Sequence, residues 1–205
     1  MKAEAVEAVI RGLKRAGVSV ATYLPDSLLK ELYPALDADP DIRTIPVTNE
    51  GEGAAIAGGV FLSGKRAVLV MENSGLRAAT EHLARMGLGA GIPVVMIMSY
   101  RGEMGENNWW AIPHGITMEP LLQTLRTPYT IVREVEEIEQ ARGHVLVPFV
   151  DQRLVDRPGR IGKLGKSALE EIALLERFDV FLGNLVIDHH AREQAGEQVQ
   201  ALVPR

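Results

Sequence analysis

Hydrophobic and polar residues follow two different periods along this chain, and the changes between them predict its secondary structure. In residues 4–16 the apolar side chains fall on one face of a helix, which Gly17 ends. That face consists of Val6, Val9, Ile10 and Leu13. Short apolar runs of strand length then recur at 18–24, 43–48, 67–71, 93–100 and 144–150, with a weaker one at 129–133.

Helical patterns separate these runs. Helices are predicted at 28–36, from 49 to about 63, and at 76–86, 117–125 and 135–142, and a polar, glycine-bearing loop at 101–115. The unbroken apolar run 94–98 indicates a strand that is buried on both faces. The pattern therefore predicts the α/β class, as a three-layer αβα fold with a mostly parallel central sheet.

The chain of 205 residues is long enough for one such domain, to which we assign residues 1–150. From Asp151 the character changes, and 151–201 is treated as a C-terminal extension without an assigned role. Within it, 178–188 is either a strand or the start of a buried helix. The last residues, 202–205, match the remnant of a thrombin-cleaved tag.

Composition narrows the class of protein. The chain has no cysteine, which excludes disulfides and cysteine-ligated metals and agrees with a cytoplasmic location. A net charge of −5 and the lack of a dense lysine/arginine run give no reason to expect nucleic-acid binding. No apolar run reaches the roughly 18 residues of a membrane span. A cytoplasmic α/β enzyme or enzyme subunit is the expectation.

The segment 48–59 is the most informative. A strand ends there, carboxylates appear, and a helix crowded with small side chains begins. Its glycines each cost about 1 kcal/mol of helix stability relative to alanine. That cost is understandable if a backbone or a ligand must approach the helix closely.

Two glutamates in this segment compete for a functional role. With Asn49 as N-cap, Glu52 takes the reciprocal position of a capping box, which is a structural role. Glu50 is the first helical residue, at the carboxyl end of a strand, where α/β sheets bind ligands. Its other explanation is favourable interaction with the helix dipole.

The spacing of Glu50 with the small residues that end at Gly59 resembles the pyrimidine-domain signature of thiamine-diphosphate enzymes. Four further segments are similar to the phosphonopyruvate decarboxylases and the related sulfopyruvate decarboxylases. They are 24–30, 71–76, 99–103 and 115–117, and with the signature they cover roughly residues 1–150. One departure is Glu72, which stands where the family more usually has glutamine.

The resemblance implies a role for several residues. Glu50 is expected to act catalytically, by hydrogen bonding to N1′ of the cofactor's aminopyrimidine. The other expected cofactor-binding residues are Pro25, Asn73 and Ser74, and the expected substrate-binding residues are Asp26, Ser27 and Arg101. Each has a plainer explanation: a turn for 25–27, a helix cap for Asn73 and an ordinary surface position for Arg101.

The resemblance also implies a partner. The family's diphosphate-binding domain carries a Gly-Asp-Gly motif and paired asparagines for magnesium. This chain has no Gly-Asp-Gly, and its one asparagine pair, Asn107-Asn108, lacks that context. Thiamine diphosphate is therefore expected to be shared with a diphosphate-binding beta subunit in a hetero-oligomer. That subunit would bind Mg²⁺, and no metal site is expected in this chain.

Three other features of the sequence add little evidence about function. His114 is interpreted as a satisfied polar residue, and His189-His190 has no carboxylate spacing that would require a metal. Trp109-Trp110 fits burial beneath a partner subunit.

These implications favour the alpha subunit of a decarboxylase that converts 3-sulfopyruvate or 3-phosphonopyruvate to the corresponding acetaldehyde and carbon dioxide. Two alternatives stay open. One is a subunit of another thiamine-diphosphate enzyme, such as an acetolactate-synthase-like carboligase. The other is a scaffold subunit without catalytic activity.

Overall fold

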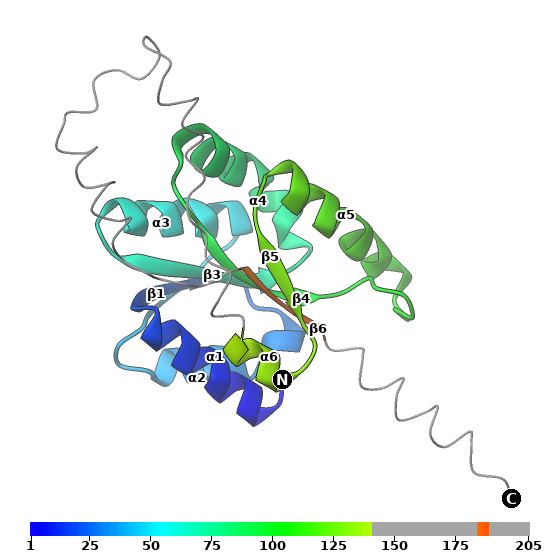
Figure 1. Ribbon diagram of the computed structural model, residues 1–205, viewed down its shortest axis with the longest axis horizontal. Helices are drawn as coiled ribbons and strands as arrows, with labels where there is room; N and C mark the ends of the chain where they lie inside the picture. Colours follow the sequence, from blue (N-terminus) through cyan, green and yellow to red (C-terminus); the bar gives the residue numbers. More distant parts are fainter. Residues whose placement is uncertain (141–183, 189–205) are drawn as a thin grey trace, which may run out of the picture.

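A parallel β-sheet forms the centre of the molecule. The computed structural model describes residues 1–140 and 184–188, and within these residues the sheet has six strands in the order β2-β1-β3-β4-β6-β5, with every neighbouring pair parallel (Figure 1). The strands are β1 (Val18–Tyr23), β2 (Arg43–Pro46), β3 (Arg66–Glu72), β4 (Val95–Tyr100), β5 (Tyr129–Val132) and β6 (Asn184–Asp188).

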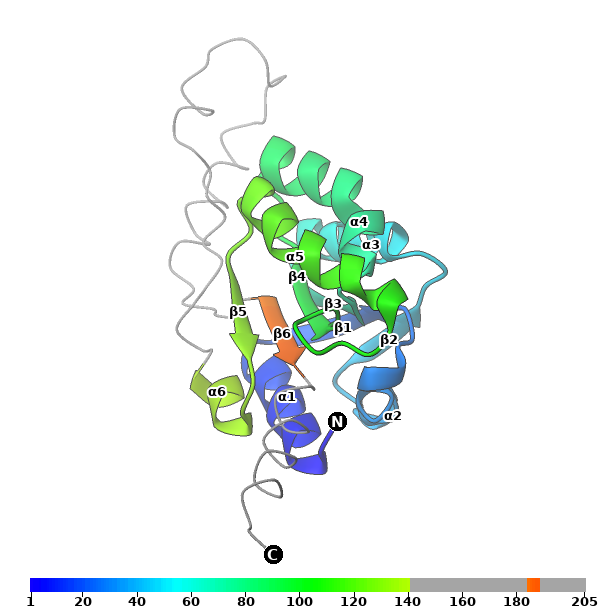
Figure 2. The same cartoon turned by 90° about the vertical axis from the view of Figure 1, so that its right-hand side faces the viewer.

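Helices cover both faces of this sheet (Figures 1 and 2). On one face lie α1 (Ala3–Arg15), α2 (Leu32–Ala38) and α6 (Val135–Gln140), and on the other lie α3 (Glu50–Leu62), α4 (Gly75–Leu83) and α5 (Ile112–Thr124). The predicted three-layer αβα fold is confirmed, and its sheet is parallel at every described pairing.

The core is divided in two by the sheet. Side chains of β3 alternate between the two halves: Val68 and Val70 pack toward α1 and α2, whereas Leu69 and Met71 pack toward α3 and α4. All four are fully buried. Burial on both faces explains why the central strands are apolar without interruption.

The predicted helix at 28–36 is divided in the structure. A short 3₁₀ turn, η1 (Ser27–Leu29), precedes α2, which starts at Leu32. Pro34 accounts for the break, because a proline in a helix interior lacks the N–H for its hydrogen bond and clashes with the carbonyl four residues earlier. Starting the helix at Leu32 places Pro34 in the first turn, where no such bond is needed.

Two other boundaries differ from the prediction. The helix predicted at 76–86 ends as α4 at Leu83 and continues as a π-helical turn, η2 (Ala84–Gly89). The predicted loop at 101–115 is shorter, because it contains a 3₁₀ turn, η3 (Trp109–Ala111), and α5 already begins at Ile112.

Some expectations lie outside the described residues. These are the strand at 144–150, most of the extension after Asp151, His189-His190 and the four C-terminal residues. Of the segment 178–188, residues 184–188 form strand β6 between β4 and β5. Among the described residues, no helix combines the length and the apolar character needed to cross a membrane.

The glycines of α3 serve packing within the chain. A Cβ on Gly51 would lie 2.6 Å from Nδ1 of His82, and one on Gly53 would lie 2.7 Å from Cδ1 of Leu69. α3 thus approaches α4 and β3 more closely than a larger residue would allow. Of the two explanations for the small residues of this helix, close approach of the backbone holds at these positions.

The loop after β4 is closed at its base by a backbone crossing. Gly102 has a φ of +86°, and a Cβ at this position would overlap the carbonyl oxygen of Ala111. From the other side, a Cβ on Gly115 would overlap the carbonyl of Gly102. The start of the loop and the first turn of α5 therefore touch through backbone alone.

Replacing Gly102 with alanine should open this crossing. A left-handed backbone conformation costs a residue other than glycine about 1–2 kcal/mol. We expect Gly102→Ala to lower the free energy of unfolding by more than this, because the added Cβ also overlaps with backbone atoms. The chain's two tryptophans, Trp109 and Trp110, both lie in the loop, so their emission in native buffer should change. Gly64→Ala is the control, because Gly64 has a φ of +79° but open space around it. Equal losses of stability and unchanged emission for both variants would contradict this.

Candidate active site at the carboxyl edge of the sheet

The expected site residues follow three adjacent strands. Asp26 comes after β1, Asn73 after β3 and Arg101 after β4. Because these strands are parallel and adjacent, their carboxyl ends meet at the same edge of the sheet. Glu50 opens α3 just after β2, the neighbour of β1 on the other side.

The two glutamates of α3 have different environments. Asn49 caps the helix by accepting a hydrogen bond from the Gly51 amide at 2.8 Å. The Glu52 carboxylate reaches back to Thr48, accepting from its amide at 3.0 Å and its hydroxyl at 3.1 Å. Glu52 therefore has the structural role predicted for it, one residue further back than a regular capping box.

Glu50, in contrast, is nearly buried and unpaired. Its exposed fraction is 9%, and its carboxylate accepts no hydrogen bond from any residue in the described part of the chain. The side chain lies against the start of α4, where a Cβ on Gly75 would be 2.5 Å from Cγ and 2.6 Å from Oε1 of Glu50. A buried carboxylate without a donor is costly, and a ligand with an N–H group would satisfy it.

Asn73 ties the ends of β3 and β4 together. Its side chain is buried, donates to the carbonyl of Arg101 at 2.9 Å and accepts from the Arg101 amide at 3.3 Å. Ser74 occupies the N-cap position of α4 without a side-chain capping bond. The amide of Asn73 thus binds backbone across the sheet instead of capping the next helix.

The segment 25–27 makes the turn that its sequence favours. Asp26 accepts a hydrogen bond from the Leu28 amide at 3.2 Å, and its own amide donates to the Tyr33 hydroxyl at 2.8 Å. Pro25 and Ser27 are exposed. The segment thus presents one carboxylate and two exposed neighbours at the site edge.

Arg101 is held inside the loop that it begins. Its guanidinium lies 3.3 Å from Glu106, and the ring of Trp110 stacks on it with its centroid 4.4 Å from Cζ. The bonds to Glu106 use Nε and Nη2, so Nη1 is the nitrogen left for an anion. A substrate that binds here would share the guanidinium with Glu106.

A contact between Glu72 and His114 is the part of the site that the sequence did not predict. Nδ1 of His114 lies 3.2 Å from Oε1 of Glu72 at the end of β3. In the sequence, Glu72 is a departure from the family and His114 is interpreted as a satisfied polar side chain, but their spacing does not predict that they meet. The available signal was the unusual carboxylate itself.

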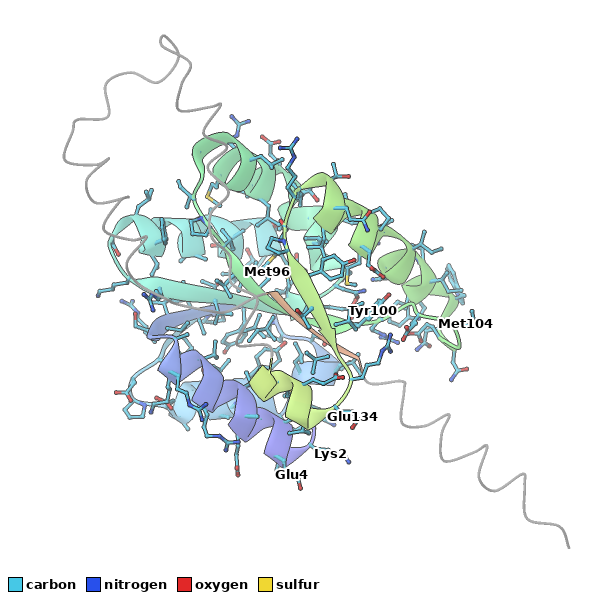
Figure 3. The ribbon with its side chains drawn as sticks, in the orientation of Figure 1. Lys2, Glu4, Met96, Tyr100, Met104 and Glu134 are labelled. Atoms are coloured by element: carbon cyan, nitrogen blue, oxygen red, sulfur yellow. The ribbon has the colours of Figure 1, made fainter. Side chains whose placement is uncertain are left out.

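The loop after β4 and the start of α5 expose five large apolar side chains, which are together called the exposed apolar patch. It consists of Met104, Trp109, Trp110, Ile112 and Ile116, from the loop and the start of α5. Trp109 is 80% exposed and Met104, at the outer end of the loop, 93% (Figure 3). Across residues 1–140 and 184–188, no group of three or more histidine, aspartate or glutamate side chains is placed to hold a metal ion.

The pairing of Glu106 predicts how the loop responds to acid. Burial raises the pKa of Glu106, but hydrogen bonds from the Asn108 amide, Arg101 and the Gly102 amide outweigh it and lower the pKa to about 2. Because the folded pKa lies below the ordinary value of about 4.3, the stabilisation is complete above that value and is lost as the pH falls toward 2. The emission of Trp109 and Trp110 should change in this window.

The matched variants separate this loop effect from general acid unfolding. Glu106→Gln should show the altered emission already at pH 7, and its acid change should be smaller. Glu81→Gln, which removes an exposed glutamate paired with Arg85 on α4, should behave like the unmodified chain. If Glu106→Gln keeps the native emission at pH 7, Glu106 does not hold the loop.

Comparison with known proteins adds independent evidence on the family. The model of the family described as "Thiamine pyrophosphate enzyme, N-terminal TPP binding domain" matches residues 3–120. That segment includes Glu50 and every other expected site residue.

Curated relatives agree with this match. The chain is 35% identical to sulfopyruvate decarboxylase subunit alpha of Methanothermobacter thermautotrophicus over 145 residues, which is 71% of this chain and 88% of that protein. It is 36% identical to the Methanococcus maripaludis subunit of that name over 125 residues, covering 61% and 75%. Phosphonopyruvate decarboxylase of Streptomyces viridochromogenes is 37% identical over 100 residues, 49% of this chain but 25% of that protein.

The resemblance drawn from the short motifs is thereby confirmed. With the matching model covering more than half of its length, the chain belongs to the family of thiamine pyrophosphate enzymes, in the N-terminal TPP-binding domain.

Proposed function

We propose that this chain is the alpha subunit of a cytoplasmic thiamine-diphosphate-dependent decarboxylase that acts on 3-sulfopyruvate, with 3-phosphonopyruvate as the second candidate. The nearly buried, unpaired carboxylate of Glu50 is the observation that carries the proposal. The products would be the corresponding acetaldehyde and carbon dioxide.

The chain fits one half of the cofactor. Glu50 offers a carboxylate without a donor to N1′ of the aminopyrimidine, and the start of α4 at Gly75 leaves its side chain room. When bound, thiamine diphosphate supplies the electron sink that lets a 2-oxo acid lose carbon dioxide. The part of Glu50 is to hold a proton at N1′ by hydrogen bonding to that nitrogen. Ser74 and Pro25 lie at the same edge and complete the proposed contacts.

The other half of the cofactor requires a partner. The sequence has no Gly-Asp-Gly motif for the diphosphate and its magnesium ion. We propose that a beta subunit supplies both and that it covers the exposed apolar patch, which begins beside the site at Trp110. Tryptophans are favoured at the centres of such interfaces. Two of the relatives described above are themselves named alpha subunits, which supports a hetero-oligomer.

The substrate side of the site is proposed to include Asp26, Ser27 and Arg101. Nη1 of Arg101 suits a sulfonate or phosphonate oxygen, because a guanidinium N–H forms a charge-assisted hydrogen bond with such an anion. The pairing with Glu106 limits how much positive charge an anion meets here.

The choice of substrate rests on the relatives. The chain spans 88% and 75% of the two sulfopyruvate decarboxylase alpha subunits described above, so the match covers most of each of them. It spans 25% of the phosphonopyruvate decarboxylase at a similar identity, which keeps that acid as the second candidate.

The assay that tests this proposal uses the assembled enzyme. The chain is co-expressed with a diphosphate-binding partner subunit, and carbon dioxide release is measured from each acid with thiamine diphosphate and Mg²⁺. Release from 3-sulfopyruvate without an added acceptor is the expected result. A product that forms only with a second carbonyl compound would indicate a carboligase. No release from either acid would indicate a scaffold subunit.

Glu50→Gln should strongly lower turnover while the fold is kept. We expect carbon dioxide release to fall by about 10²–10⁴-fold, the range for a lost acid–base group, while co-purification with the partner is unchanged. Glu52→Gln is the control, since it weakens the cap by up to about 1 kcal/mol but leaves Glu50 in place. Near-normal turnover of Glu50→Gln would refute the role of Glu50.

Gly75→Ala tests the position of the Glu50 side chain. The added Cβ would lie 2.5 Å from Cγ of Glu50, so the carboxylate must move and turnover should fall. Adding Gly75→Ala to Glu50→Gln should cost no further activity, because both changes act on one group. Gly12→Ala, a helix glycine with open space in α1, should leave activity unchanged. Additive losses in the double variant would show that Gly75 acts in some other way.

A further inference from the structure

Glu106 is a negative charge fixed beside the guanidinium that is proposed to bind the substrate. Its carboxylate oxygens lie 3.4 Å from Nε and 3.3 Å from Nη2 of Arg101. They also accept hydrogen bonds from the backbone amides of Gly102 at 3.3 Å and Asn108 at 3.0 Å. The Glu106 side chain is 1% exposed. A buried carboxylate with several donors is held in one place and in its charged form.

The surroundings of Arg101 leave one direction for a second anion. The ring of Trp110 covers a face of the guanidinium, with its centroid 4.4 Å from Cζ. Glu106 takes the edge formed by Nε and Nη2, which leaves Nη1. An anion that binds at Nη1 therefore shares the guanidinium with Glu106. Two anions then lie on one positive charge.

The other charged groups near this position do not add a net positive charge. Glu72 and His114 meet at the end of β3, and burial raises the pKa of Glu72 and lowers the pKa of His114. Burial thus favours the neutral form of both. Asp26 places a carboxylate near Glu72, and Arg77 places a guanidinium near His114, so these two charges offset each other. The paired guanidinium of Arg101 is left to receive the anion.

The two candidate substrates differ in the charge that they bring to this position. A sulfonate is the anion of a strong acid and has a single negative charge wherever the protein is folded. A phosphonate loses a second proton near neutral pH, as a phosphate monoester does with a pKa of about 6. At an arginine without a partner, the second charge would strengthen binding. Beside Glu106 the added attraction to the guanidinium is opposed by repulsion from the carboxylate.

We propose that Glu106 is a specificity-determining residue, which makes the anion position at Arg101 favour a singly charged sulfonate over a doubly charged phosphonate. The proposal rests on the proposed function, because it takes the 3-substituent of the acid to bind at Arg101. Glu106 also holds the loop, as its hydrogen bonds to Gly102 and Asn108 show. The two roles can be separated, because only the selection depends on the charge of the ligand.

Anion binding is tested on the full chain alone, without cofactor or partner. Methanesulfonate and methylphosphonate are added at constant ionic strength, and the ¹³Cζ signal of Arg101, assigned from Arg101→Lys, is followed. At about pH 5, where both anions have one charge, we expect equal affinities. At about pH 8.5, where methylphosphonate has two charges, it should still bind no more tightly than methanesulfonate. A gain of about tenfold for methylphosphonate between these pH values, as an unpaired arginine would give, would overturn the proposal. No shift with either anion would do the same.

Three variants separate the charge of Glu106 from its support of the loop. In Glu106→Gln the second charge meets an uncompensated guanidinium, so methylphosphonate should bind about tenfold more tightly than methanesulfonate at the higher pH. Glu106→Asp keeps the charge and should restore much of the original ratio. Glu103→Gln removes another loop carboxylate, which pairs with Arg133 instead of Arg101, and should behave like the unmodified chain. Equal ratios in Glu106→Gln and the unmodified chain would contradict the proposed role.

The assembled enzyme tests the selection between the two acids themselves. We expect Glu106→Gln to shift the ratio of kcat/KM toward 3-phosphonopyruvate by about tenfold at the higher pH, and much less at the lower pH. Loss of loop support alone would lower both values of kcat/KM without this pH-dependent change of their ratio, and that result would overturn the proposal. If the unmodified enzyme decarboxylates neither acid while the anions bind to the chain as expected, the proposed function fails and the role of Glu106 stands.

Discussion

The hydrogen bonds between the Asn73 amide and the backbone of Arg101 organise this end of the molecule. They join the chain where it leaves β3 to the chain where it leaves β4, and both partners are buried from water. From this point the first segment leads through Ser74 to Gly75 and the Glu50 side chain. The second leads through Glu106 and Trp110 to His114. The same hydrogen bonds therefore fix the positions of two groups of polar side chains, one along each segment.

The fold could be predicted from sequence because its determinants are local and repeated. The apolar run 94–98 follows from burial of a strand on both faces, and the apolar stripe of 4–16 follows from burial of a helix on one face. Neither pattern depends on which elements pack against it. The same holds for the cap at Asn49, whose side chain needs only the next turn of its own helix. Where the prediction was wrong, at 28–36, the cause was also local, a proline that the periodicity does not register.

The site was only partly predictable, because several of its contacts join residues far apart in the chain. Glu50 could be found from its position at a strand end, but its lack of a donor depends on what Gly75 and α4 leave open. The contact of Glu72 with His114 spans the whole of α4 and β4, and no spacing in the sequence encodes it. The sequence predicts that Arg101 faces an anion. Its pairing with Glu106 depends on the fold of the loop and is visible only in the structure.

The crossing of Gly102 and Gly115 has a consequence for how such a loop can diversify. It closes residues 102–115 into a ring, and the neck of this ring is the backbone contact between the two glycines. A larger residue at one glycine therefore cannot be compensated by a change at the other. Residues between them, including Met104 and Trp109 at the rim, are not bound by this restriction. Because loop closure depends only weakly on length, insertions and deletions inside the ring would reshape the face offered to other molecules while β4 and α5 stay where they are. Relatives with different preferences are then expected to differ inside this ring and to share its neck.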